Sequence, residues 1–170
     1  MQSSLNLERL YDDHAQAMFA FLLNFLRSEA DTFDVMQDVF IKLTRRPELL
    51  RGMRDERSFL LRTAHNLAID LMRRQSTRGK NYEQLALDSA VTFAGADPDE
   101  QVFRKELAAA LGKLPAEQRS VVHLKLWEGL TFEAIAETLE IPMNTAASRY
   151  RYGIDKLRER LRPIYDEIKE

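Results

Sequence analysis

Residues 129–161 decide the fold of this chain, and they read GLTFEAIAETLEIPMNTAASRYRYGIDKLRERL. Two amphipathic helical patterns are separated here by a four-residue turn at residues 140–143. Thr131 is the predicted N-cap of the first helix. The apolar positions that follow it recur at helical spacing and are Phe132, Ile135, Ala136 and Leu139. Two helices joined by so short a turn form a helix-turn-helix, whose second helix enters the DNA major groove.

The second helix of this motif begins after the turn, where Asn144 or Thr145 is the predicted cap. Its apolar stripe consists of Ala146, Tyr150, Ile154, Leu157 and Leu161. The opposite, polar side carries Thr145, Ser148, Arg149, Arg151, Tyr152 and Lys156. The alternative is a helical hairpin without a role in DNA reading. We favour the DNA-reading unit because small Ala136 and Ala146 occupy the expected crossing of the helices.

Glu140 departs from the usual chemistry of such a turn. A residue there commonly adopts positive φ, which glycine does without a steric penalty and glutamate does not. The sequence therefore predicts either a slightly strained turn at Glu140 or a turn of different geometry.

Composition favours an all-α protein with one or two small cores, since 45% of the 170 residues are hydrophobic and helix formers dominate. A membrane helix needs about 18 consecutive apolar residues. No such run and no signal-peptide pattern occur, so we expect a cytoplasmic protein without membrane insertion. The absence of cysteine excludes disulfides and cysteine-ligated metals. His14, His65 and His123 have no second ligand at a metal-binding spacing, so we expect neither metal nor cofactor.

The charge is unevenly distributed. The chain has a net charge of −2, whereas residues 143–162 carry six basic and two acidic side chains, a local charge of +4. Affinity for DNA depends on neutralising phosphates with Lys and Arg. We therefore expect weak DNA binding by the chain alone and a larger partner that holds it on the template.

The chain divides into two helical domains, 1–75 and 101–170, joined by a flexible linker at 76–100. The linker region contains Gly79, Gly95 and Pro98, lacks a sustained period, and over residues 75–100 carries two basic against five acidic side chains. The C-terminal domain contains the helix-turn-helix.

A polar cluster marks the second predicted helix, at about residues 31–45. Asp34, Gln37 and Asp38 lie at positions i, i+3 and i+4 and so share one face. The apolar stripe of this helix consists of Phe33, Met36, Val39, Phe40 and Leu43. An acidic and amide cluster of this kind is ordinarily a solvated face, and an interaction surface is the alternative.

Pro47 and Gly52 are predicted to end the second helix and to leave an arginine-rich loop, after which the third long helix begins near Asp55 or Ser58. Its buried stripe is Leu60, Ala64, Leu67, Ala68 and Leu71. Another face carries Arg62, His65, Asn66, Asp70, Arg73 and Arg74. Such side chains hydrogen-bond both phosphates and base edges, although an ordinary solvated face fits the spacing equally well.

Three stretches in this order resemble the extracytoplasmic-function group of bacterial RNA polymerase sigma factors, within the sigma-70 family. They are DVMQDVFIKL (34–43), SFLLRTAHNLAIDLMRR (58–74) and GLTFEAIAETLEIPMNTAASR (129–149). The resemblance implies that domain 1–75 is sigma region 2, which binds the polymerase clamp and the minus-ten promoter element. Domain 101–170 is implied to be sigma region 4, which binds the minus-thirty-five element.

The resemblance also implies roles for individual residues. Asp34, Gln37 and Asp38 match the motif that binds the clamp of the largest subunit of core RNA polymerase, while the flap of the second-largest subunit is a further expected partner. The implied minus-ten residues are Arg62, His65, Asn66, Arg73 and Arg74, together with the loop at 51–57. The implied minus-thirty-five residues are Thr145, Ser148, Arg149, Arg151 and Tyr152. Promoter DNA and an anti-sigma factor are the other expected partners.

The resulting hypothesis is a factor that confers promoter specificity on polymerase and is not itself an enzyme. No nucleophile and base pair, phosphate-binding glycine loop or metal carboxylate set supports catalysis. Two alternatives remain, namely a sigma-like mimic that binds an anti-sigma regulator and a stand-alone helix-turn-helix transcription regulator. Departures from the family pattern at Phe59, His65, Glu140 and Ala147 prevent transfer of a promoter sequence.

Overall fold

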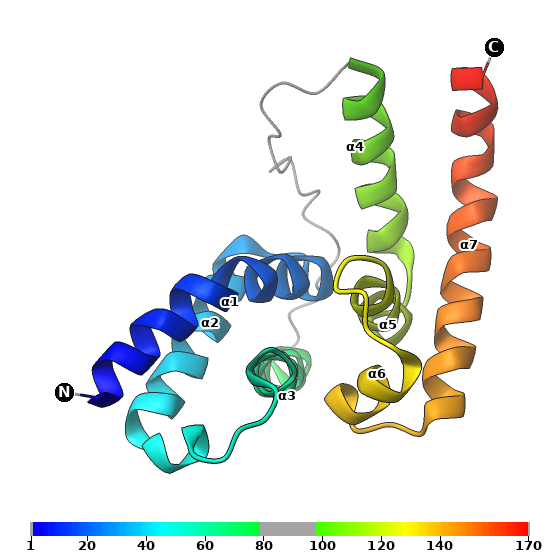
Figure 1. Ribbon diagram of the computed structural model, residues 1–170. Coiled ribbons are helices and arrows are strands. Elements are labelled where there is room, and N and C mark those ends of the chain that lie inside the picture. Colours follow the sequence, from blue (N-terminus) through cyan, green and yellow to red (C-terminus); the bar gives the residue numbers. More distant parts are fainter. Residues whose placement is uncertain (1, 79–97, 170) are drawn as a thin grey trace.

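The computed structural model describes residues 2–78 and 98–169, which form helices and connecting turns without a strand (Figure 1). The prediction of an all-α fold is confirmed. Most of the predicted linker, residues 79–97, lies outside the described residues. We call residues 2–78 the N-terminal unit and residues 98–169 the C-terminal unit.

The N-terminal unit consists of α1 (Gln2–Leu26), α2 (Glu29–Arg45), the short 3-10 helix η1 (Pro47–Leu50) and α3 (Glu56–Thr77). α2 begins two residues before the predicted start because the Ser28 hydroxyl accepts a hydrogen bond from the Asp31 N–H at 3.2 Å. α3 begins as predicted, since the Asp55 carboxylate accepts from the Ser58 N–H at 3.1 Å.

The three long helices of the N-terminal unit pack against one another around fully buried side chains. This core includes Phe21, Leu22, Val39, Leu43, Leu60 and Ala64. Phe33 belongs to the predicted apolar stripe of α2, yet its side chain is 50% exposed. It lies at the edge of the core, where its ring contacts that of Phe19 at a centroid distance of 5.2 Å.

The C-terminal unit consists of α4 (Pro98–Lys113), α5 (Ala116–Leu126), α6 (Phe132–Leu139) and α7 (Met143–Lys169). α7 packs against α4, α5 and α6, and Figure 1 shows its long axis beside that of α4. Gly153 allows α5 and α7 to approach closely, because a Cβ atom at this position would lie 2.7 Å from Cγ2 of Val122. A side chain there would force the two helices apart.

α6 and α7 form the predicted helix-turn-helix, with the Thr131 hydroxyl capping α6 by accepting from the Ala134 N–H. Glu140 follows α6 in the left-handed conformation, with φ 57° and ψ 48°. Of the two turn geometries considered, the strained one is therefore present. The predicted caps Asn144 and Thr145 are wrong, since the Pro142 carbonyl already accepts from the Ala146 N–H and α7 begins at Met143.

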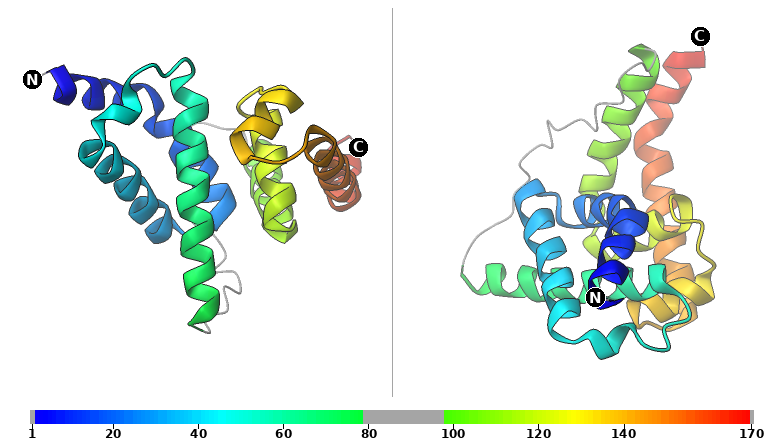
Figure 2. Two further views of the ribbon diagram at one scale, coloured as in Figure 1. Left: turned by 90° about the horizontal axis from the view of Figure 1, so that it is seen from below. Right: turned by 60° about the vertical axis from the view of Figure 1, so that its left-hand side comes forward.

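The two units pack directly against each other, α1 against α5 and α3 against α6. The left view of Figure 2 shows the C-terminal unit beside α3. One apolar cluster runs through the junction and joins Phe21 and Phe25 of α1 to Val121 and Leu124 of α5 and Ile135 of α6. Side chains of both units therefore form a shared core.

Candidate functional site

The first candidate surface is the outer face of α2. Asp34, Gln37 and Asp38 are all exposed, and none of the three side chains forms a hydrogen bond or ion pair within residues 2–78 and 98–169. Phe33 and Ile41 flank them with 50% and 46% of their surface exposed. We define these five residues as the α2 surface.

The α2 surface combines exposed apolar side chains with unpaired polar ones, which is the usual composition of a protein-binding patch. It borders a shallow groove of about 250 Å³ that is lined by Asp38, Ile41, Lys42, Arg45 and Arg46. The sequence analysis missed Ile41. This residue lies seven positions after Asp34 and four after Gln37, so helical periodicity places it on the same face as both.

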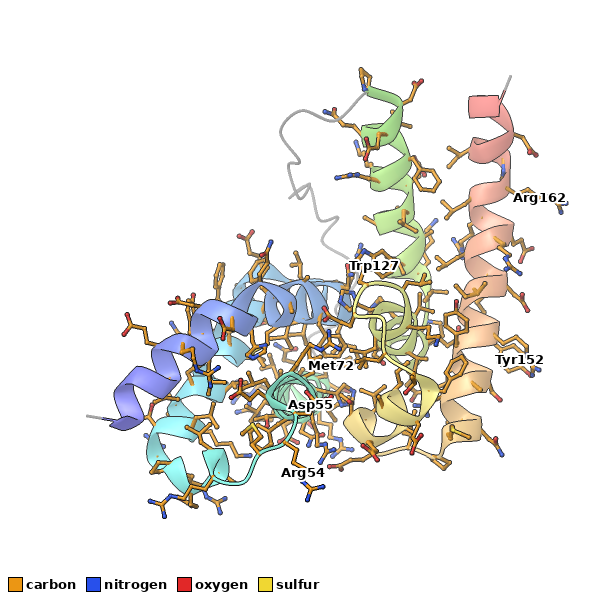
Figure 3. The ribbon with its side chains drawn as sticks, viewed as in Figure 1. Arg54, Asp55, Met72, Trp127, Tyr152 and Arg162 are labelled. Atoms are coloured by element: carbon orange, nitrogen blue, oxygen red, sulfur yellow. The ribbon has the colours of Figure 1, made fainter. Side chains whose placement is uncertain are left out.

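The second candidate surface lies on α3 and in the loop that precedes it. Asn66, Arg73 and Arg74 are exposed on α3. Arg54 is also exposed, and Figure 3 shows its side chain extending away from the helices. Gly52 turns the loop with φ 73°, a conformation that favours glycine. These basic and amide groups are accessible to a nucleic acid.

Arg62 and His65 differ from the rest of the predicted minus-ten set. The Nε atom of Arg62 and the Nδ1 atom of His65 are buried without a hydrogen-bond partner among the described residues. The His65 ring lies 5.2 Å from the Phe25 ring, and burial lowers the pKa of this histidine. Its imidazole is therefore neutral at pH 7, while Asn66 beside it remains exposed.

The third candidate surface is a groove of about 540 Å³ where α7 meets the start of α6. It is lined by Phe132, Asn144, Ala147, Ser148, Tyr150, Arg151, Ile154, Asp155 and Arg158. Ser148 and Arg151 of the predicted minus-thirty-five set thus share one wall. Tyr152 is 54% exposed beside them and points away from the rest of the chain in Figure 3.

The same geometry separates Arg149 from this groove. Its guanidinium lies 3.8 Å from the Glu117 carboxylate of α5, and Thr145 precedes it by four positions on the same side of α7. Sequence reasoning missed Asn144 as a lining residue because we assigned it to the cap, and it did not single out Arg158. Helical spacing could have identified both residues, because Asn144 lies four positions before Ser148 and Arg158 lies seven positions after Arg151.

The described part of the chain contains neither a cluster of three or more His, Asp or Glu side chains suited to a metal ion nor a helix long and apolar enough to cross a membrane.

Comparison with known families identifies the chain. Residues 10–78 match Sigma-70 region 2, and residues 110–159 match Sigma-70 region 4. The chain is 30% identical to the ECF RNA polymerase sigma factor SigL of Mycobacterium tuberculosis over 162 residues, which cover 93% of this chain and 90% of the relative. It is 32% identical to the ferric citrate uptake sigma factor FecI of Escherichia coli over 148 residues, covering 84% and 83%.

A solved structure has the same fold. It is the sigma factor RpoE of Bartonella quintana, in complex with the anti-sigma factor NepR, with a TM-score of 0.76 and 20% sequence identity. The match covers 92% of this chain and 97% of the other. From the region 2 and region 4 matches and the similarity to SigL along nearly its whole length, we conclude that the chain belongs to the extracytoplasmic-function group of RNA polymerase sigma factors.

Proposed function

We propose that three separate surfaces of this chain perform the steps by which a sigma factor directs core RNA polymerase to promoters. The α2 surface binds the polymerase clamp, the exposed part of α3 and its preceding loop bind the minus-ten element, and α7 binds the minus-thirty-five element. The observation that carries the proposal is the order of the region 2 and region 4 matches together with a helix-turn-helix whose α7 groove carries Arg151 and Arg158.

The α2 surface suits a protein partner better than DNA. Asp34 and Asp38 are anionic and would repel phosphates, whereas they complement a basic patch on a protein. Phe33 and Ile41 supply apolar area on either side of the two carboxylates. We therefore assign the clamp of the largest polymerase subunit to this surface, with the apolar pair as additional anchors.

The α3 surface suits single-stranded DNA. Asn66 presents an amide that donates to and accepts from base edges, while Arg73 and Arg74 are positioned to bind phosphates. Extruding a base from the duplex costs a few kcal/mol, so side chains that hold the extruded base favour strand opening. We assign capture of the non-template strand to this face and to the loop at 51–57.

The α7 groove suits duplex DNA. Ser148 and Asn144 lie near the start of the helix, where the recognition helix of this motif contacts base edges. Arg151 and Arg158 follow on the same wall and can bind phosphate or guanine. Arg149 and Thr145 remain proposed contacts at the side of the helix, with Arg149 released from Glu117 when DNA binds.

The chain itself would carry out no chemistry, because polymerase forms the phosphodiester bonds and the factor contributes binding specificity. We expect it to act in the cytoplasm beside polymerase. RpoE of Bartonella quintana is bound by the anti-sigma factor NepR, and we propose that an anti-sigma factor likewise regulates this chain.

Promoter-specific transcription with purified core polymerase tests the proposal. A library of genomic fragments is transcribed with and without the chain, and the new transcripts are mapped to their start sites. We expect starts preceded by two shared elements, about one helical turn or more apart. Binding of a regulator without any new start would support the mimic, and sequence-specific DNA binding without core polymerase would support the stand-alone regulator.

A further inference from the structure

The loop at residues 51–57, to which the proposed function assigns strand capture, is held mainly at its two ends. At its start the Arg51 N–H donates to the Glu48 carbonyl at 3.2 Å. Within residues 2–78 and 98–169, no hydrogen bond or ion pair is made by residues 52–54. Figure 3 shows the Arg54 side chain extending away from the helices. The direction of Arg54 therefore depends on how the two ends of the loop are fixed.

The C-terminal end of the loop is anchored first by the cap of α3. The Asp55 carboxylate accepts from the Ser58 N–H at 3.1 Å and from the Ser58 hydroxyl at 2.7 Å. Both contacts lie within three positions of sequence. They define the start of α3 without fixing it to another helix.

A second anchor of this end comes from α1. Arg9 forms a bidentate ion pair with Glu56, the first residue of α3, in which Nη2 donates to Oε1 at 2.6 Å and Nη1 donates to Oε2 at 3.2 Å. Nε2 of His14 lies 3.4 Å from the same carboxylate. Leu10, next to Arg9, is only 2% exposed, so this part of α1 is fixed to the core. Glu56 thus joins the end of the loop to a residue 47 positions earlier in the chain.

The geometry of this ion pair specifies an orientation. Two parallel N–H to carboxylate bonds constrain the planes of both groups at once, which a single hydrogen bond does not do. The Asp13 carboxylate also accepts from Nη1 of Arg9 at 3.2 Å and so holds the guanidinium from its own helix. The hydrogen bond from Arg9 lowers the pKa of Glu56, so this carboxylate is ionised at pH 7.

The ion pair is poorly suited to a mainly stabilising role. The side chain of Arg9 is 48% exposed and that of Glu56 is 34% exposed. Exposed ion pairs contribute little to the free energy of unfolding. Glu56 also places a negative charge beside a surface proposed to bind DNA, where it opposes the binding of phosphates. A carboxylate at this position is explained if it orients the loop.

We infer that Arg9 and Glu56 are positioning residues for strand capture, which hold the C-terminal end of the loop against α1 so that Arg54 is presented to the non-template strand. The inference rests on the proposed function. Arg9 and Glu56 act through the loop and do not themselves contact DNA. Without their ion pair the chain keeps its fold and its closed-complex binding, but the loop reorients and captures fewer opened strands.

The mobility of the loop tests the first step without reference to transcription. The chain lacks cysteine, so a nitroxide label can be attached uniquely at Arg54→Cys in the full chain. We expect Arg9→Gln and Glu56→Gln each to increase the mobile fraction of the label about threefold. Asp13→Asn makes the same change of charge as Glu56→Gln but breaks only a contact within α1, so it should leave the mobile fraction unchanged. Equal mobility in all four proteins would overturn the inference.

Promoter opening tests the second step. Permanganate footprinting measures open complexes formed with core polymerase, and a gel shift measures total binding. We expect Arg9→Gln and Glu56→Gln each to reduce opening about threefold and to leave closed-complex binding unchanged. The double variant should reduce opening no further, because either change already removes the single contact. Arg9→Lys retains the charge and should restore part of the opening.

The direction of the two effects distinguishes positioning from direct DNA binding. If Arg9 bound a phosphate itself, Arg9→Gln would weaken opening whereas Glu56→Gln, which removes a negative charge, would strengthen it. That result would overturn the inference, and so would full opening by the double variant. An unaltered chain that opens no promoter would refute the proposed function, while the mobility of the label still decides whether the ion pair holds the loop.

Discussion

Arg119 on α5 donates a hydrogen bond to the main-chain carbonyl of Phe25 at the end of α1, across 94 positions of sequence. This contact joins the unit that carries the α2 and α3 surfaces to the unit that carries the helix-turn-helix. Because Arg119 also donates to the carbonyls of Gly112 and Leu114, it connects the turn before α5 to the neighbouring unit. The predictions below concern the free energy of unfolding, the affinity for core polymerase and the extent of promoter opening.

Replacing Arg119 with alanine should lower the free energy of unfolding by about 3 kcal/mol, since three buried carbonyls lose a charged donor and a cavity remains. Chemical denaturation measures this loss. Arg158→Ala removes an exposed arginine from α7 and should change stability by less than about 0.5 kcal/mol. If the two variants are equally stable, the buried contacts of Arg119 do not stabilise the fold.

Gln37→Ala together with Asp38→Ala should weaken binding to core polymerase about tenfold and leave the melting temperature unchanged, because exposed polar side chains contribute little to folding. Affinity is measured with fluorescently labelled chain and purified core polymerase. Ile41→Ala should weaken binding independently, through lost apolar contact. Glu106→Ala, on the exposed face of α4, is the control. Unchanged affinity in the double variant would show that the α2 surface does not bind the polymerase clamp.

Asn66→Ala should reduce open-complex formation more than closed-complex binding, since its amide is proposed to contact DNA only after the strands separate. Permanganate footprinting of unpaired thymines measures opening, and a gel shift measures total binding. Ser76→Ala, exposed near the end of the same helix, serves as the matched control. A footprint as strong as that of the unaltered factor would show that Asn66 has no part in capture.

Glu140→Gly should raise the free energy of unfolding by up to about 1 kcal/mol, because glycine relieves the left-handed strain that glutamate experiences at φ 57°. The added freedom of the unfolded chain offsets part of this gain. Glu137→Gly, within α6, should have the opposite sign and cost about 1 kcal/mol. A lower melting temperature for Glu140→Gly would mean that contacts of the glutamate outweigh its backbone strain.

Acid should lower the free energy of unfolding through His65. Burial is the main cause of its lowered pKa, with a smaller contribution from the charge of Arg149, while Asn66 and Glu140 act in the opposite direction. Below its ordinary value of 6.5 the unfolded chain binds a proton that the folded chain binds less readily. The contribution of His65 to stability is therefore complete above that pH and is lost as pH falls through the lowered pKa.

Denaturation curves between pH 7 and pH 5 measure this dependence, in a range where ordinary carboxylates remain ionised. His65→Gln should flatten it, since glutamine has no charge to gain. An identical pH dependence in both chains would show that other groups cause the loss. The pKa of the Glu128 carboxylate is lowered chiefly by the His123 imidazole, whose Nε2 atom lies 3.9 Å from it, so the effect of Glu128 falls in the more acidic range and is separable.

The sequence by itself determined what depends on neighbours in the chain. The capping residues Asp55 and Thr131 and the helical periods follow from side-chain chemistry within a few positions. The sequence left two geometries open for the turn at Glu140, and the structure shows the left-handed one. The three stretches at residues 34–43, 58–74 and 129–149 were also sufficient to indicate the resemblance to sigma factors. Each of these features is local, so a short window of sequence contains its physical cause.

Only the tertiary structure decided which faces are accessible. The polar pattern of α3 assigned Arg62, His65 and Asn66 to one surface, yet in the folded chain Asn66 is exposed while polar atoms of the other two are buried, with the His65 ring against Phe21 and Phe25 of α1. In the same way Phe33 is exposed although its helical position is apolar, and Arg149 faces Glu117 instead of the α7 groove. Local periodicity specifies which residues share a face, whereas burial depends on contacts between different helices.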